Sequence, residues 1–237
     1  MKGSWNGSVL FSLTFTLNTP GSPSTLSVLS TSNLFLSGHT GTQGMSSPGT
    51  GPGFLSVAGS GGKAVRFTNV TGTWGCAGSS NVGADGGSCA GGVTNINSYR
   101  GIAGLTHSNK TMFLAGVFLD DTEPADPAPS RLDVTNYNTL GTIQPALRQT
   151  FFIGDGLTAA SARQDFIVPA GATRLYLGVV DAAGFQGGPC CYDDNVGSIS
   201  VSYEIGAPGG GGGGGGGTPS LSISLSPSTS SSADRKS

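Results

Sequence analysis

The stretches VPAGATRLYLGVVD (168–181) and VGSISVSYEI (196–205) decide the fold of this chain. The first is a run of strand-forming residues that ends on a carboxylate, Asp181. In the second, apolar and polar residues alternate from Ser198 to Ile205, which is typical of an antiparallel strand with one buried face. We therefore expect two paired strands joined by the loop AAGFQGGPCCYDDN (182–195).

The connecting loop carries acidic and amide side chains that indicate a metal site. Asp193, Asp194 and Asn195 directly precede the second strand, and Asp181 closes the first. Because paired strands bring both ends of their loop together, these side chains are expected to meet at one rim of the sheet. Oxygen ligands of this kind suit a hard cation, most simply calcium.

A second interpretation is that these residues only cap a solvated loop, since Asp and Asn favour turns. Carboxylates that converge at one rim repel one another unless a cation neutralises them, and this favours calcium. Asp193 is expected to point outward rather than to bind the cation.

The composition fits a turn-rich β protein with low-complexity ends. The 237 residues include 42 Gly and 13 Pro, and only 10% are charged. The formal net charge of -2 gives no basic surface for nucleic acid. No apolar run is long enough to span a bilayer. Neither nucleic acid nor a membrane span is therefore expected.

Three parts are expected along the chain. Residues 1–53 are rich in Ser, Thr, Gly and Pro and are interpreted as a leader, either with irregular strands or loosely ordered. In this leader, Lys2 followed by Val9–Leu17 weakly resembles an export signal, and a truncated start is the alternative. Residues 54–206 are expected to form the domain, and residues 207–237 a poly-Gly tether with a disordered Ser-rich tail.

Within residues 54–206, short strand patterns alternate with turn signals, and no helical periodicity is sustained. AVRFTNVTGTW (64–74) predicts a strand that ends at Trp74, and TMFLAGVFL (111–119) predicts a central strand buried on both faces. The fold class expected is all-β, as an antiparallel β-sandwich or jelly roll.

The chain has four cysteines, Cys76, Cys89, Cys190 and Cys191. They lack the Cys-x2-Cys spacing and the nearby histidines of a zinc site. Disulfides formed in an oxidising compartment are therefore expected. Four cysteines allow three pairings, and a vicinal Cys190–Cys191 bridge, bridges to separate partners and free thiols all stay open.

No catalytic arrangement stands out in the sequence. The only histidines are His39, in the leader, and His107, on a polar turn, and no Gly-x-Ser-x-Gly motif is present. The chain is not expected to be an enzyme. An acidic, proline-containing stretch is interpreted as a solvated loop rather than a second cation site; its acids are Asp120, Asp121, Glu123, Asp126 and Asp133.

Four motifs carry a family resemblance when they are taken together: TGTWGCAG (71–78), GADGGS (83–88), LAGVFLDD (114–121) and the stretch 168–201. They are similar to the calcium-dependent galactophilic bacterial lectins and to the lectin-related domains of exported bacterial proteins. The resemblance covers roughly residues 54–205. It implies a galactose-binding-domain-like β-sandwich, secreted or at the bacterial cell surface, in which one calcium ion bridges the protein to two sugar hydroxyls.

The resemblance also implies a role for individual residues. The calcium ligands would be the side chains of Asp181, Asp194 and Asn195 and the main-chain carbonyls of Cys191 and Ala77. The residues expected to face the sugar are Asp85, Asp193, Tyr192 and Phe185, the last two as an apolar surface, for which Trp74 is a further but more buried candidate.

The chain departs from the lectin pattern in three ways. Its loop between Asp181 and Asp194 is longer, Asp194 stands where the lectins have an amide, and the lectins' sugar-contacting histidine has no counterpart. An extra carboxylate strengthens calcium binding. The function expected is a secreted calcium-dependent carbohydrate-binding module, with galactosides as the first sugars to test. The alternative is a structural or adhesive surface module in which calcium only stabilises the rim loops.

Overall fold

The computed structural model describes residues 24–78 and 81–209. The expected export signal, the poly-Gly tether beyond Gly209 and the Ser-rich tail lie outside these residues. The part that is described consists of strands and short 3-10 turns without an α-helix, so the fold is all-β as predicted. No helix in this part is long and apolar enough to cross a lipid bilayer.

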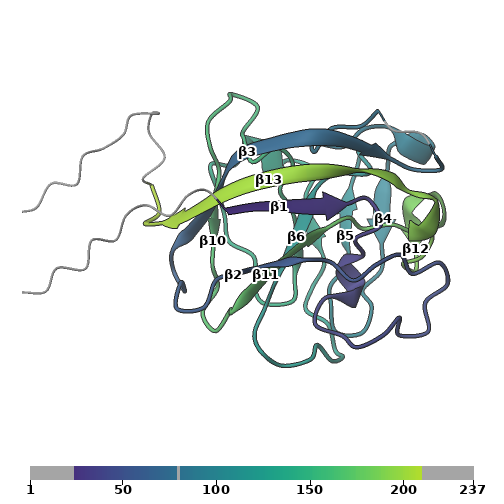
Figure 1. The fold of residues 1–237 in the computed structure, drawn as a ribbon, viewed down its shortest axis with the longest axis horizontal. Coiled ribbons are helices and arrows are strands. Elements are labelled where there is room, and N and C mark those ends of the chain that lie inside the picture. Colours follow the sequence, from purple (N-terminus) through teal and green to yellow (C-terminus); the bar gives the residue numbers. More distant parts are fainter. Residues whose placement is uncertain (1–23, 79–80, 210–237) are drawn as a thin grey trace, which may run out of the picture.

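Two sheets pack face to face, and a third, smaller sheet lies at one end (Figure 1). The first sheet contains, in spatial order, β1 (Ser24–Leu29), β13 (Val196–Gly206), β3 (Ala64–Gly75), β10 (Asp165–Ile167) and β8 (Thr142–Ile143). The second contains β2 (Phe54–Ser56), β11 (Arg174–Gly178), β6 (Ala115–Leu119) and β9 (Thr150–Phe152). The third contains β12 (Gln186–Gly187), β4 (Thr94–Ile96), β5 (Leu105–His107) and β7 (Leu132–Asp133).

In the part of the chain that the structure describes, five 3-10 turns occupy the connections between strands. They are η1 (Leu34–Leu36), η2 (Cys89–Gly91), η3 (Tyr137–Thr139), η4 (Ala183–Phe185) and η5 (Tyr192–Asp194). Three of these turns, η2, η4 and η5, lie in the loops that build the candidate site described below.

The core lies between the two large sheets and is rich in phenylalanine. Phe67 of β3 meets Phe166 of β10 edge-on at 5.5 Å between ring centroids, and Phe166 in turn contacts Phe151 of the second sheet at 5.8 Å. Every residue of β6 is buried, as predicted for a central strand between two neighbours. Large rings that interlock across the interface fix how the two sheets stack.

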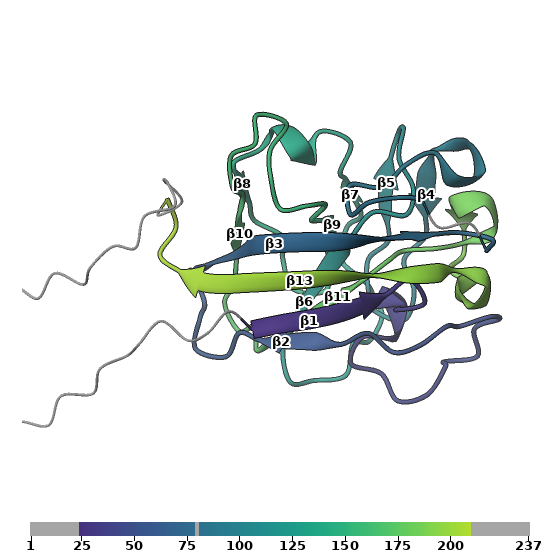
Figure 2. The same ribbon diagram turned by 45° about the horizontal axis from the view of Figure 1, so that its top comes forward.

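The prediction for β13 is confirmed in its pattern but wrong in its pairing. Ile199 and Val201 are buried on the inner face, and Ser198 and Ser200 alternate with them. However, β13 pairs with β1 and β3, whereas β11 pairs with β2 and β6 of the other sheet. The two strands are therefore not a hairpin, and the loop 182–195 crosses from one layer to the other (Figure 2).

The expected boundary at Phe54 does not mark the start of the folded part. β1 pairs along its whole length with β13, from Ser24 opposite Tyr203 to Leu29 opposite Ser198. Leu34 and Phe35 of η1 are completely buried. Residues 24–53 thus belong to the same sandwich, because the alternation in this Ser-rich segment is enough to supply an edge strand.

Candidate metal and ligand site

Asp181 lies beyond the end of β11 and is held from several sides. It is only 3% exposed. Its carboxylate accepts hydrogen bonds from the Ala182 backbone N–H at 2.7 Å and from Asn195 Nδ2 at 2.8 Å. Its own backbone N–H donates to the Tyr192 hydroxyl at 2.9 Å, and its carbonyl accepts from the Cys190 N–H at 3.1 Å. The loop that follows β11 therefore folds back onto this one residue.

Burial raises the pKa of the Asp181 carboxyl to about 7. The hydrogen bonds from Asn195 and Ala182 lower this pKa, and the negative charge of Asp194 raises it. Burial prevails because a carboxylate that has lost its hydration is costly unless a positive charge replaces the water. A divalent cation bound to Asp181 would supply that charge.

Asn195 is the second buried polar residue of the site, with 5% of its surface exposed. Its Nδ2 donates to Asp181 and also to the Ser30 carbonyl at 3.2 Å. Its Oδ1 is buried and has no hydrogen-bond partner within the described residues. An unpaired buried acceptor is costly, so Oδ1 is a ready ligand for a cation.

A pocket of about 200 Å³ opens beside Asp181. Its lining combines predicted ligand residues with residues of η4 and a disulfide: Asp181, Asp194, Cys191, Ala77, Cys76, Ala90, Ala182, Ala183, Gly184 and Phe185. The Asp194 side chain is exposed and has no partner within the described residues, while its carbonyl accepts from the Gly78 N–H at 3.0 Å. That backbone bond ties η5 to the loop after β3.

The residues present fit calcium by their chemistry. Two carboxylates, one amide oxygen and the main chain at Ala77 and Cys191 supply only hard oxygen donors. Residues 24–78 and 81–209 contain no metal-binding group of three or more His, Cys, Asp or Glu side chains. The candidate ligand set differs from such a group because it has only two carboxylates and relies on the Asn195 amide and the main-chain carbonyls of Ala77 and Cys191.

Two of these positions have unusual backbone conformations. Ala77 has φ of 51° and Cys191 has φ of 75°, both in the left-handed region that residues with a Cβ rarely adopt. Such conformations collect at sites where the surrounding contacts enforce them. The neighbouring Gly197 also has a positive φ, and a Cβ there would lie 2.3 Å from the Thr73 carbonyl oxygen.

The residues expected to face a sugar are not all brought to the pocket. Phe185 lines it, although the ring is buried. Tyr192 is fully buried, so its ring presents no face to a ligand, and its hydroxyl instead holds Asp181. Asp193 points outward and accepts from the Gly49 N–H at 2.9 Å. Asp85 does not line this pocket and accepts from the Asp155 N–H at 2.9 Å.

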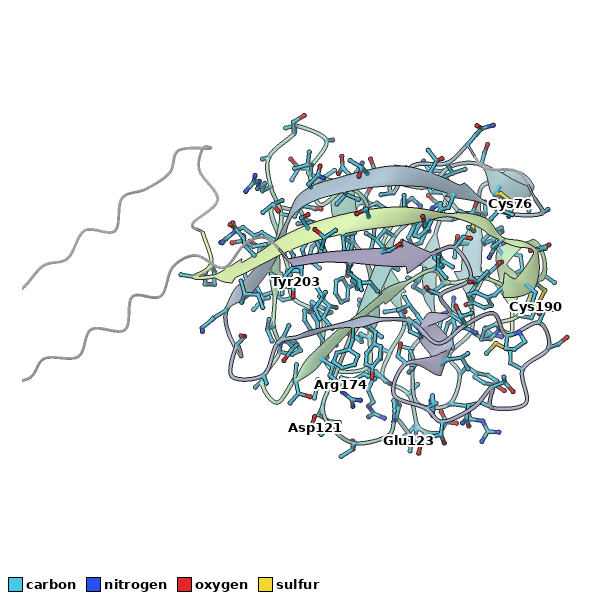
Figure 3. All side chains as sticks on the ribbon, in the orientation of Figure 1. Cys76, Asp121, Glu123, Arg174, Cys190 and Tyr203 are labelled. Atoms are coloured by element: carbon cyan, nitrogen blue, oxygen red, sulfur yellow. A yellow bond between two sulfur atoms is a disulfide. The ribbon has the colours of Figure 1, made fainter. Side chains whose placement is uncertain are left out.

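The four cysteines form two disulfides that flank the site (Figure 3). Cys76–Cys89 staples the loop after β3, in one of the pairings that the sequence left open. Cys190 and Cys191 are bonded to each other, and none of the four thiols, all within the described residues, is free. Trp74, two residues before Cys76, is core: it is fully buried and donates to the Met112 carbonyl at 2.8 Å.

The acidic stretch has contacts typical of structured turns. The carboxylates of Asp120 and Asp133 each accept from the N–H and the hydroxyl of the threonine two residues later, and these bonds lower both pKa values. Asp126 accepts from Gly101 N–H, and Glu123 contacts His39 at 3.0 Å. These acids therefore stabilise turns within the stretch and connect it to the segments around Gly101 and His39.

One contributor to the site was not found from the sequence, and the role expected of another was wrong. The Ser30 carbonyl binds Asn195 but comes from the segment interpreted as a leader, and Tyr192 was expected to face the ligand. A serine that acts through its main chain leaves no signal in the side-chain pattern.

Comparison with known proteins gives no relative: the chain matches no protein family, no curated protein and no solved structure.

Proposed function

We propose that this protein is an exported, calcium-dependent carbohydrate-binding module with a galactose-binding-domain-like jelly-roll fold. The main observation is that Asp181, Asp194, Cys191 and Ala77 line one pocket. Asn195, whose buried Oδ1 has no partner within the described residues, is hydrogen-bonded through Nδ2 to Asp181. These five residues come from the segments after β3, after β11 and before β13. Their convergence supports the set that the family resemblance implies.

The roles of the residues follow from their burial. Asp181 and Asn195 are buried and fixed to each other, so they would form the rigid inner part of the cation site. Asp194 is exposed, so it would bind the cation from the solvent side. The bound ion would offer its remaining coordination positions to vicinal hydroxyls of a sugar, with galactosides as the first class to test.

A structural role for calcium is the second candidate. Backbone bonds already join the loops around the pocket, from Gly78 to Asp194 and from Tyr192 N–H to the Ser47 carbonyl at 2.9 Å. A cation at their centre would stabilise the rim without any sugar. This candidate predicts calcium binding that galactosides leave unchanged.

Thermal unfolding of the full chain with calcium or with chelator tests the cation site. At a hundred times the Kd, calcium adds about 2.7 kcal/mol to the free energy of unfolding, a shift of several degrees in Tm. Asp181→Asn should lose this shift, whereas Asp193→Asn, a matched change of an exposed carboxylate, should keep it. A wild-type Tm that does not respond to calcium contradicts the proposal.

The sugar is tested at saturating calcium. A galactoside that raises Tm further, and does so only without chelator, supports a lectin function. A Tm that rises with calcium, together with no binding to any sugar on a glycan array, favours the structural role.

A further inference from the structure

The Cys190–Cys191 disulfide lies on the loop that closes the candidate cation pocket. Cys191 lines the pocket, and Cys190 N–H binds the Asp181 carbonyl. Both cysteines are partly exposed at the end of the sandwich, where Figure 3 places the Cys190 sulfur at the surface. Cys76 and Cys89 are also partly exposed, although they pack against the buried core. Both disulfides are therefore open to a dithiol, and the vicinal bond is the one that constrains Cys191.

The conformation of Cys191 needs an external constraint. Its φ of 75° is left-handed, which a residue with a Cβ adopts only at an energetic cost. The residues on both sides are fixed, since Cys190 N–H binds Asp181 and Tyr192 N–H binds the Ser47 carbonyl. The sulfur–sulfur bond closes a small ring that contains the Cys190–Cys191 peptide and limits the conformations that this peptide can adopt.

From these features we infer that the Cys190–Cys191 disulfide is a redox switch for the cation site. When the bond is reduced, Cys191 leaves the left-handed conformation and its main chain no longer faces the cation. Calcium affinity then falls. This inference rests on the proposed function, because it concerns the regulation of the same site.

The chemistry is thiol–disulfide exchange with a dithiol. A thiolate of the dithiol attacks one cysteine sulfur and forms a mixed disulfide, and its second thiol then displaces that sulfur. Two electrons and two protons pass to Cys190 and Cys191, which become thiols, and the dithiol becomes a cyclic disulfide. Since binding and reduction are linked, calcium must in turn protect the bond from reduction.

The test compares calcium binding to the full chain in its oxidised form and after treatment with dithiothreitol, by titration calorimetry. We expect the Kd for calcium to rise about tenfold or more on reduction. This factor corresponds to the free-energy cost of a left-handed conformation at a residue with a Cβ. Mass spectrometry after alkylation shows which bond has opened, and calcium should lower the fraction of Cys190–Cys191 that is reduced at equilibrium with a fixed ratio of reduced to oxidised dithiothreitol.

Two double variants distinguish the loss of the left-handed conformation at residue 191 from a general loss of structure. Cys190→Ser/Cys191→Ala keeps Cys76–Cys89 and should bind calcium as weakly as the reduced protein, with or without dithiol. Cys190→Ser/Cys191→Gly should regain most of the affinity, because glycine adopts a positive φ freely. Circular dichroism of both variants checks that the fold persists.

The outcomes distinguish this inference from the proposed function. Equal affinity of the oxidised protein, the reduced protein and the Ser/Ala variant overturns the redox switch and leaves the calcium site intact. A protein that binds no calcium even when oxidised contradicts both.

Discussion

Asp181 makes the stability of the cation-free protein depend on pH. Its carboxyl has a pKa of about 7 in the folded state, above the ordinary value near 3.8 that it regains on unfolding. The folded state therefore holds the extra proton between these values, and its stability falls as the pH rises from about 4 to about 7. The slope from this one group approaches about 1.4 kcal/mol per pH unit.

Removing the Asp181 charge should therefore stabilise the protein when chelator is present. We expect Asp181→Asn to unfold at higher denaturant concentration than wild type at pH 8 and to match it near pH 4. Asp193→Asn serves as the control and should unfold at the same denaturant concentration as wild type at both pH values. Equal stability of Asp181→Asn and wild type at pH 8 would show that burial of this carboxylate costs little.

Tyr192 should matter for stability rather than for ligand contact. Its hydroxyl accepts from the buried Asp181 N–H, so Tyr192→Phe leaves that donor without a partner. We expect a loss of about 1–3 kcal/mol in the free energy of unfolding, measured by chemical denaturation. Tyr203→Phe should change this free energy little, because the ring is partly buried and its hydroxyl has no hydrogen bond among residues 24–78 and 81–209.

The sequence predicted the candidate ligand residues of this site better than it predicted which side chains are buried. Carboxylates and an amide at the two ends of one loop pointed to Asp181, Asp194 and Asn195, which the structure brings together. The same pattern could not show that Tyr192 is buried, because its burial depends on neighbours distant in the sequence. Gly49, for example, would meet the Tyr192 Cβ if it carried a side chain.

At the scale of elements, β1 should be required for folding. Without residues 24–53, β13 becomes an exposed edge, and the core loses Leu34 and Phe35. Loss of one large buried side chain costs about 2–5 kcal/mol, and a domain has only about 5–15 kcal/mol in total. A chain that begins at Phe54 should aggregate or unfold without cooperativity, and one that begins at Ser24 should give a single sharp transition by calorimetry.

The strands themselves were easier to predict than their partners. The alternation of β13 and the unbroken apolar run of β6 define where they are buried. Pairing is decided by sequence-distant contacts, and β11 and β13 belong to different sheets although only a short segment with the two-residue strand β12 separates them. The predicted meeting of the loop ends still holds, because stacked sheets also bring them to one end of the molecule.

For the molecule as a whole, calcium binding and protonation should compete. A cation at Asp181 requires the ionised carboxylate, so each ion bound to a protonated site releases a proton. We expect the calcium affinity to weaken by up to about tenfold per pH unit below about 7. Titration calorimetry between pH 5 and 8, in buffers of different ionisation heat, measures both the affinity and the proton release. An affinity that is constant over this range would contradict the assignment of Asp181 as a ligand.

The first and last described strands leave the sandwich at the same pole, opposite the disulfides (Figures 1 and 3). Ser24 lies beside Tyr203 in the β1–β13 ladder, only a few residues before the described chain ends at Gly209. Ends that lie this close together permit a domain to be inserted into a surface loop of a host protein, or to be circularly permuted. In such a chimera the pocket would lie at the end of the domain far from the host and would stay accessible to solvent.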